Sequence, residues 1–204
     1  MTAIVLAVAL SVGAATASAE PAGEATDEPT ELPWYVPDLA KVQFAGNIGF
    51  LSAAAGYSYL NQKLETEVFF GFVPPFVGNK AVYMASLKQH YVPWEFGWGE
   101  ALHIAPLYVG IFSSYTFGSE FEIFPDNWAG GKDFYTEQSA LRLGPLIGGR
   151  LRADIEPYGP VDDIGAYWEL NVSDLGLKAY FSNTGYFDFY DVLTLGVGVR
   201  VGFR

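Results

Sequence analysis

The sequence predicts an all-β fold, an antiparallel β-barrel, and three observations carry this prediction. First, apolar and polar residues alternate with a period of two along most of the chain after Lys41. Second, aromatic residues make up 17% of the chain and 23 glycines are scattered through it, a composition that favours strands and turns over a helical bundle. Third, no run of eighteen apolar residues follows the N-terminal segment, which argues against a spanning helix.

The N-terminal segment, residues 1–19, has the pattern of a secretory signal peptide. An apolar stretch is followed by small residues that end in Ala17-Ser18-Ala19, a small-x-small cleavage site before Glu20. No lysine or arginine precedes the apolar stretch, so a short N-terminal anchor is the alternative. Residues 20–40 are acidic, proline-rich and without apolar period, and they predict a periplasmic linker. The barrel is then expected over residues 41–204.

Within that range the alternation predicts eight strands, with ten as the alternative count. The last strand is the clearest, because one of its faces carries only apolar side chains: Leu193, Leu195, Val197, Val199, Val201 and Phe203. The expected strands span residues 41–50, 51–60, 63–73, 80–93, 102–116, 138–153, 164–182 and 190–204. The apolar phase slips near Asp174, which we interpret as a bulge or a turn.

The charge pattern favours a transmembrane barrel over a soluble one. A soluble barrel of the lipocalin type has an apolar interior and a charged outer surface. Here only 17% of residues are charged, and each strand has one nearly uncharged face and one that mixes glycine with a few charges. The short turn at residues 61–63 and the long loop at residues 118–137 also suit a bacterial outer-membrane barrel. A soluble barrel that binds a small apolar ligand remains an alternative.

The C-terminus resembles the sorting signal that the outer-membrane assembly machinery reads. That signal has a terminal aromatic residue, an apolar residue two positions earlier and a glycine five positions earlier, which Phe203, Val201 and Gly198 match. Arg204 departs from the pattern, because it follows the aromatic residue. The chain from Lys41 onward is similar to the small bacterial outer-membrane β-barrel proteins. This resemblance implies an outer-membrane location, with outer-membrane lipids, lipopolysaccharide and the assembly machinery as partners.

A narrower resemblance concerns residues 179–185, Ala-Tyr-Phe-Ser-Asn-Thr-Gly. They are similar to the His-x-Ser-Asn segment of outer-membrane lipid A deacylases, eight-stranded barrels that cut an ester with a Ser–His–Glu arrangement. Ser182 matches the nucleophile, but Tyr180 takes the place of the histidine. With a pKa of about 10, a tyrosine cannot serve as a base near neutral pH. A lipid A esterase is therefore the alternative to the preferred non-enzymatic, structural or loop-displaying role.

On the predicted strands, charged side chains occupy the positions that alternate with the apolar ones. They therefore point to the opposite side of the barrel wall. They predict a polar network that fills the lumen of a narrow, closed barrel: Glu65, Glu67, Arg142, Arg150, Arg152, Glu169, Lys178 and Arg200. Opposite charges on neighbouring strands can pair there, so a packed polar core is expected rather than a substrate site.

Other classes of function find little support. The net charge of −12 argues against nucleic acid binding, and the absence of cysteine excludes disulfides and cysteine metal sites. His90 and His103 lack a third ligand at metal-binding spacing, so neither a metal nor a cofactor is expected. The acidic and aromatic loop at residues 117–137 could display a surface to an extracellular partner.

Overall fold

The computed structural model describes residues 33, 35–78, 80–118, 140–158, 160–182 and 188–203. The strands are β1 Leu39–Ala45, β2 Leu51–Tyr59, β3 Leu64–Val73, β4 Val82–Tyr91, β5 Phe96–Trp98, β6 Leu102–Phe117, β7 Leu141–Tyr158, β8 Val161–Asn171 and β9 Thr194–Phe203. The helical segments are α1 Pro75–Gly78, α2 Asp174–Ser182 and the 3₁₀ helix η1 Phe189–Val192. In these residues no helix has the length and apolar content needed to cross a membrane.

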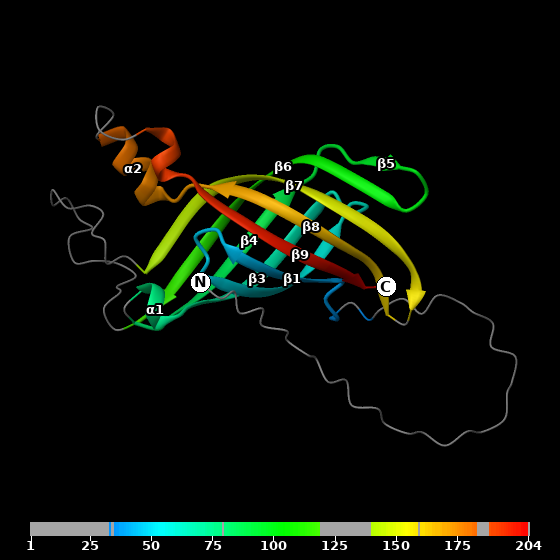
Figure 1. Cartoon of the computed structure of the whole chain (residues 1–204), viewed down its shortest axis with the longest axis horizontal. Coiled ribbons are helices and arrows are strands. Elements are labelled where there is room, and N and C mark those ends of the chain that lie inside the picture. The colour runs from blue at the N-terminus through cyan, green and yellow to red at the C-terminus, as the bar shows by residue number, and fades with distance from the viewer. Residues whose placement is uncertain are drawn as a thin grey trace, which may run out of the picture. The chain divides into compact units, whose positions relative to one another are not determined.

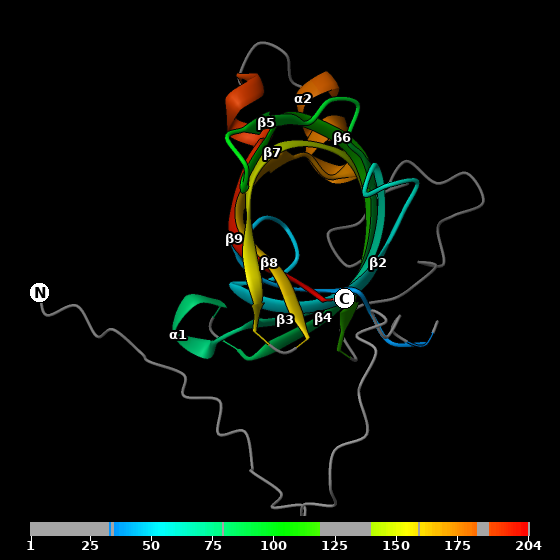
Figure 2. The ribbon, with the colours of Figure 1, turned by 90° about the vertical axis from the view of Figure 1, so that its right-hand side faces the viewer.

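The strands form a closed antiparallel barrel. The hydrogen-bonded order is β4-β3-β2-β1-β9-β8-β7-β6, and pairing of β4 with β6 closes the ring of eight strands (Figure 2). The short strand β5 stands outside this ring and pairs only with the first residues of β6. The predicted eight-stranded antiparallel barrel is therefore confirmed, and the sequence pattern missed only β5 among the described strands.

The two ends of the barrel differ. We call one end the short-turn end, because β2–β3 and β7–β8 are joined there by a few residues; β1 begins and β9 ends at the same end. We call the other the long-loop end, because it carries α1, α2 and η1 (Figure 1). The segment that contains β5 connects β4 to β6 at the short-turn end.

Each strand separates polar from apolar side chains. On β3, Glu65 and Glu67 are 0% and 1% exposed in the interior, whereas Val68 and Phe70 are 56% and 62% exposed on the outer wall. Successive side chains of a strand point to opposite faces, so this alternation repeats along the ring. The barrel thus has an apolar exterior and an interior that holds the buried charges together with some buried aromatic side chains, such as Phe69, Tyr108 and Phe112.

Two strand boundaries predicted from the sequence are wrong. The predicted strand 41–50 ends at Ala45, where four positions between Ala45 and Gly49 take positive φ and turn the chain inward. Ile48 is consequently buried rather than placed on the outer wall. β2 begins directly after this turn, at Leu51.

The predicted strand 164–182 is also wrong in its second half. β8 ends at Asn171 and α2 follows, because Ser173 caps the helix by accepting a hydrogen bond from the backbone N–H of Gly176 at 3.2 Å. The predicted strands 138–153 and 190–204 are shifted instead: β7 extends to Tyr158, and β9 begins only after η1.

Candidate functional site

The candidate site is the charged interior of the barrel. Strands β1, β3, β4, β7, β8 and β9 each send polar side chains into it. Its buried polar side chains include Lys41, Gln43, Glu65, Glu67, Lys88, His90, Arg150, Arg152, Asp163, Glu169 and Arg200. We refer to this set as the interior network.

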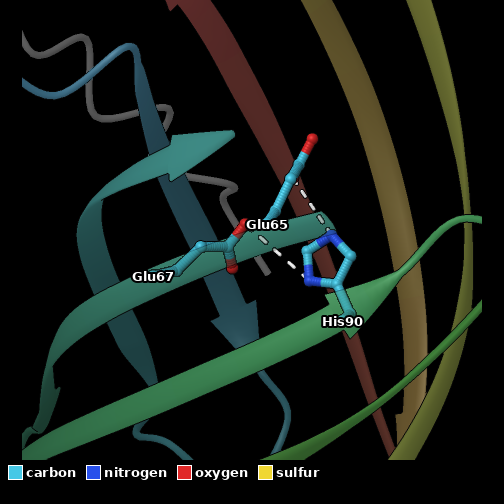
Figure 3. A group of neighbouring side chains, drawn as sticks. All are labelled: Glu65, Glu67 and His90. Carbon is cyan, nitrogen blue, oxygen red and sulfur yellow. Dashed lines mark ion pairs between the residues drawn. The ribbon is translucent and has the colours of Figure 1, made fainter. Parts of the chain in front are cut away.

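The first part of the interior network joins β1, β3 and β4. The Nζ of Lys41 lies 3.1 Å from Glu65 and also contacts Glu67, so one ammonium is shared by two carboxylates. Lys41 reaches β3 across β2, because the residue beside it on β2 is Ala54. His90 lies on β4 beside these carboxylates, with Nε2 3.0 Å from Glu65 (Figure 3).

The second part is built around the amide of Gln43. Its Oε1 accepts hydrogen bonds from Lys88 at 2.8 Å and from the Tyr167 hydroxyl at 3.0 Å. Its Nε2 donates to Glu169 and to the carbonyl of Ala45, each at 3.0 Å. All the hydrogen-bonding capacity of this amide is used, which fixes its orientation. No polar atom of the buried side chain is therefore left without a partner.

Lys88 and Glu169 form an ion pair across the interior, from β4 to β8. Neither residue has more than 3% of its side chain exposed, so the charges are held away from solvent. Paired charges in such surroundings stabilise each other strongly, and each is costly if its partner is removed.

The third part lies at the short-turn end and is organised by Arg150. Its guanidinium contacts Glu65 on β3, donates to Glu95 at 2.6 and 3.2 Å, and donates to the carbonyl of Gln62 at 3.1 Å. Arg152 donates to the other oxygen of Glu95 at 3.0 Å. One arginine of β7 therefore ties together β3, the β2–β3 turn and the segment before β5.

Glu95 is the member of this cluster that comes from a connecting segment. Burial opposes its ionisation, but Arg150 and Arg152 more than offset this and lower the pKa of its carboxyl below the ordinary value. Glu95 is therefore a carboxylate near neutral pH.

A polar cavity of about 220 Å³ adjoins the network at the short-turn end. Asp38, Asp163 and Arg200 contribute to its lining. The Nη1 of Arg200 is 3.6 Å from Asp163, and its Nη2 is 3.9 Å from Glu65. These separations hold the charges near one another without direct hydrogen bonds.

One group of side chains has the composition of a metal site. Ligand atoms of Glu65, Glu67 and His90 lie within 4.8 Å of one another. The sequence offers His90 no third ligand at metal-binding spacing, and it is strand pairing that sets Glu65 directly opposite it. However, the ammonium of Lys41 already contacts both carboxylates, and Arg150 contacts one of them. A divalent cation would have to displace Lys41, so this group does not favour a metal.

Most of the residues predicted for the lumen lie together. The structure buries Glu65, Glu67, Arg150, Arg152, Glu169 and Arg200 in the interior. Arg142 is half-buried and lines a separate cavity of about 390 Å³ at the long-loop end. Lys178 was misplaced by the prediction: it lies on α2, outside the strands, because its segment is helical.

Sequence reasoning missed several members of the interior network. Lys41, Gln43, Lys88 and Asp163 were left out, as was Glu95 at its rim. A signal was present for the first two, because Lys41 and Gln43 alternate with the apolar Val42 and Phe44 along one strand. Glu95 gave no such signal, since it precedes a strand of three residues.

Ser182 is exposed at the end of α2, on the long-loop side. His90 and His103 lie on β4 and β6 near the short-turn end, where Glu65 and Asp154 hold them at 3.0 and 2.8 Å. In the described part of the chain, neither histidine is therefore placed to activate Ser182.

The other predicted sites lie on β9 and in the long loop. The three positions that resemble the assembly signal, Gly198, Val201 and Phe203, are on β9, which pairs with β1 and β8. Residues 119–139, most of the loop predicted to meet an extracellular partner, lie outside the described residues.

Comparisons with known proteins found no matching family model, no matching curated protein and no matching solved structure. The function must therefore be argued from the geometry of the barrel itself.

Proposed function

We propose that this chain is a non-enzymatic integral protein of a bacterial outer membrane, a closed barrel that stabilises the envelope or displays its loops. The observation that carries the proposal is the distribution of polarity across the wall. Five cations of the interior network are almost fully buried, whereas large apolar side chains cover the outside. A protein surrounded by water has the opposite arrangement, because exposed apolar area is costly and buried charge more so.

The aromatic residues of the outer wall support the same proposal. Tyr59 and Tyr91 end their strands near the short-turn end, and both are exposed. Tyr83 and Phe117 pair with each other at the long-loop end and are exposed as well. Membrane barrels place aromatic girdles at the two interfaces and aliphatic residues between them. Here Val68 and Leu87 pair between the two ends and supply such a band.

The dimensions are also suitable. The ring strands range from 7 residues in β1 to 18 in β7, and most have 9–11. A tilted transmembrane strand needs about 9–11 residues. An eight-stranded ring encloses a space that side chains fill, and the interior network supplies them, which supports a closed lumen rather than an open pore.

Two alternatives account for less of the geometry. An apolar ligand in a lipocalin-like barrel would need an apolar interior, whereas Lys88, Glu169 and Arg150 fill this one with charge. A lipid A esterase would need a base beside Ser182, where the described residues place no histidine.

Fractionation of a Gram-negative host that expresses the full chain tests the proposal. The protein should sediment with outer membranes, resist carbonate extraction, and migrate faster on gels when it is not boiled. Recovery in the soluble periplasmic fraction would refute a membrane location. Steady single-channel conductance in planar bilayers would refute the closed lumen.

A further inference from the structure

The side chains around Glu95 have the geometry of a binding site for a carboxylate. Arg150 donates two hydrogen bonds to Glu95 Oε2, at 2.6 and 3.2 Å, and Arg152 donates one to Oε1 at 3.0 Å. The Nδ1 of His103 is 3.8 Å from the same Oε1. Both oxygens of the carboxylate are therefore held by guanidinium groups, the arrangement that proteins use to recognise carboxylates and phosphates.

The arginines are fixed parts of the wall, whereas the carboxylate is brought by a connection. Arg150 and Arg152 lie two residues apart on β7, and their side chains are only 2% and 9% exposed. Glu95 precedes β5, and its neighbours Trp94 and Phe96 are each 58% exposed. Trp94 and Phe96 add little apolar packing, so the connection around Glu95 is attached by the pairing of β5 with β6 and by these ion pairs.

The site also opens toward solvent. Asp154 and His103, which flank Arg152, have side chains 42% and 29% exposed, and Glu95 itself is 22% exposed. A small anion can therefore reach the arginines from the short-turn end if Glu95 leaves.

We propose that Arg150 and Arg152, with His103 beside them, form an oxyanion-binding site that Glu95 fills as a tethered ligand. The chemical class of a free ligand is a carboxylate, or a phosphate that presents two oxygens in the same way. A tether of this kind acts at an effective concentration in the millimolar range or above, so a weak free anion does not displace Glu95 from the intact chain. Removal of the Glu95 carboxylate opens the site to such anions.

The test is chemical rescue of Glu95→Ala, measured on the full chain refolded in detergent micelles at pH 7. The probes are sodium acetate and sodium phosphate, each compared with sodium chloride at the same ionic strength. The urea unfolding midpoint of Glu95→Ala should be below that of the wild type, and acetate should raise it in a saturable way that chloride does not reproduce. The wild type should respond equally to acetate and chloride. Phosphate tells the two ligand classes apart: rescue by acetate alone indicates a carboxylate site, and rescue by both indicates a general oxyanion site.

Glu100→Ala is the matched control, because Glu100 is an exposed glutamate on the same connection. It loses the same charge and should show neither the drop in midpoint nor the rescue. Should Glu95→Ala fail to fold, Glu95→Gln keeps the size of the side chain, and saturation-transfer NMR of acetate replaces the midpoint. An unchanged midpoint in Glu95→Ala, or equal effects of acetate and chloride on it, overturns the proposal. Micelles are used throughout, so the result is independent of the membrane in which the barrel resides.

Discussion

Arg150 contacts Glu65, Glu95 and the carbonyl of Gln62, and its replacement by leucine should weaken the fold markedly. In Arg150→Leu, Glu65 loses one cation but keeps Lys41 and His90. Glu95 keeps Arg152 and can regain some water, since its side chain is 22% exposed. Breaking a buried ion pair from one side costs about 3–5 kcal/mol, and these remaining contacts set our expectation at about 3 kcal/mol.

The assay is urea unfolding of the barrel in lipid vesicles, compared between wild type, Arg150→Leu and Arg150→Lys. The lysine variant keeps the positive charge but cannot reproduce the fork of hydrogen bonds to Glu95, so it should lie between the other two. The unfolding midpoints of both variants should be below that of the wild type, and the leucine variant should have the lower of the two.

A midpoint of Arg150→Leu equal to or above that of the wild type would refute the reasoning. It would mean that the guanidinium contributes nothing in the interior, or that it faces the acyl chains, where leucine is the better residue.

Three further outcomes are expected. Gly148→Ala should destabilise the barrel by about 1–3 kcal/mol, because its Cβ would collide with the ring of Tyr108, whereas Gly97→Ala, with open space around the new Cβ, should leave the unfolding midpoint unchanged. The pKa of Glu95 is lower in the folded protein than in the unfolded chain, so its ionisation stabilises the fold. This stabilisation is fully present above about pH 4.3, the ordinary glutamate pKa, and is lost as the pH falls through the lower folded-state pKa. The unfolding midpoint of Glu95→Gln should lack this component of the pH dependence. Mass spectrometry of lipid A from cells with the wild type, Ser182→Ala or no protein should show the same acylation in all three, and loss of one acyl chain that depends on Ser182 would establish the esterase instead.

The strands of the ring were predictable because each carries its own period-two pattern. On β3 and β9 that pattern alone separates the charged face from the apolar face, without knowledge of any neighbour. The helix α2 was not predictable in this way, because Leu175, Leu177, Ala179 and Phe181 also alternate. The local signal that distinguishes them from a strand is the cap at Ser173, which a period-two pattern does not contain.

The contacts of the interior network were beyond sequence reasoning for a different reason. Which strands face each other across a lumen depends on ring closure and register, and no single strand records either. His90 illustrates the point: the chain contains no ligand pattern beside it, yet strand pairing sets Glu65 opposite. Glu95 is positioned only because β6 extends past the end of β4 and offers an edge to β5.

The pairing of charges across the lumen has a consequence for assembly. Glu169 meets Gln43 and Lys88 over sequence separations of 126 and 81 residues, and Arg150 meets Glu65 over 85. A partly built sheet would present these charges without their partners, and in lipid such a sheet is strongly disfavoured. The stabilisation from these ion pairs is obtained only when β1 pairs with β9 and closes the ring. Closure of the ring is therefore expected to be nearly all-or-none. Contacts this distant in sequence also make folding slow.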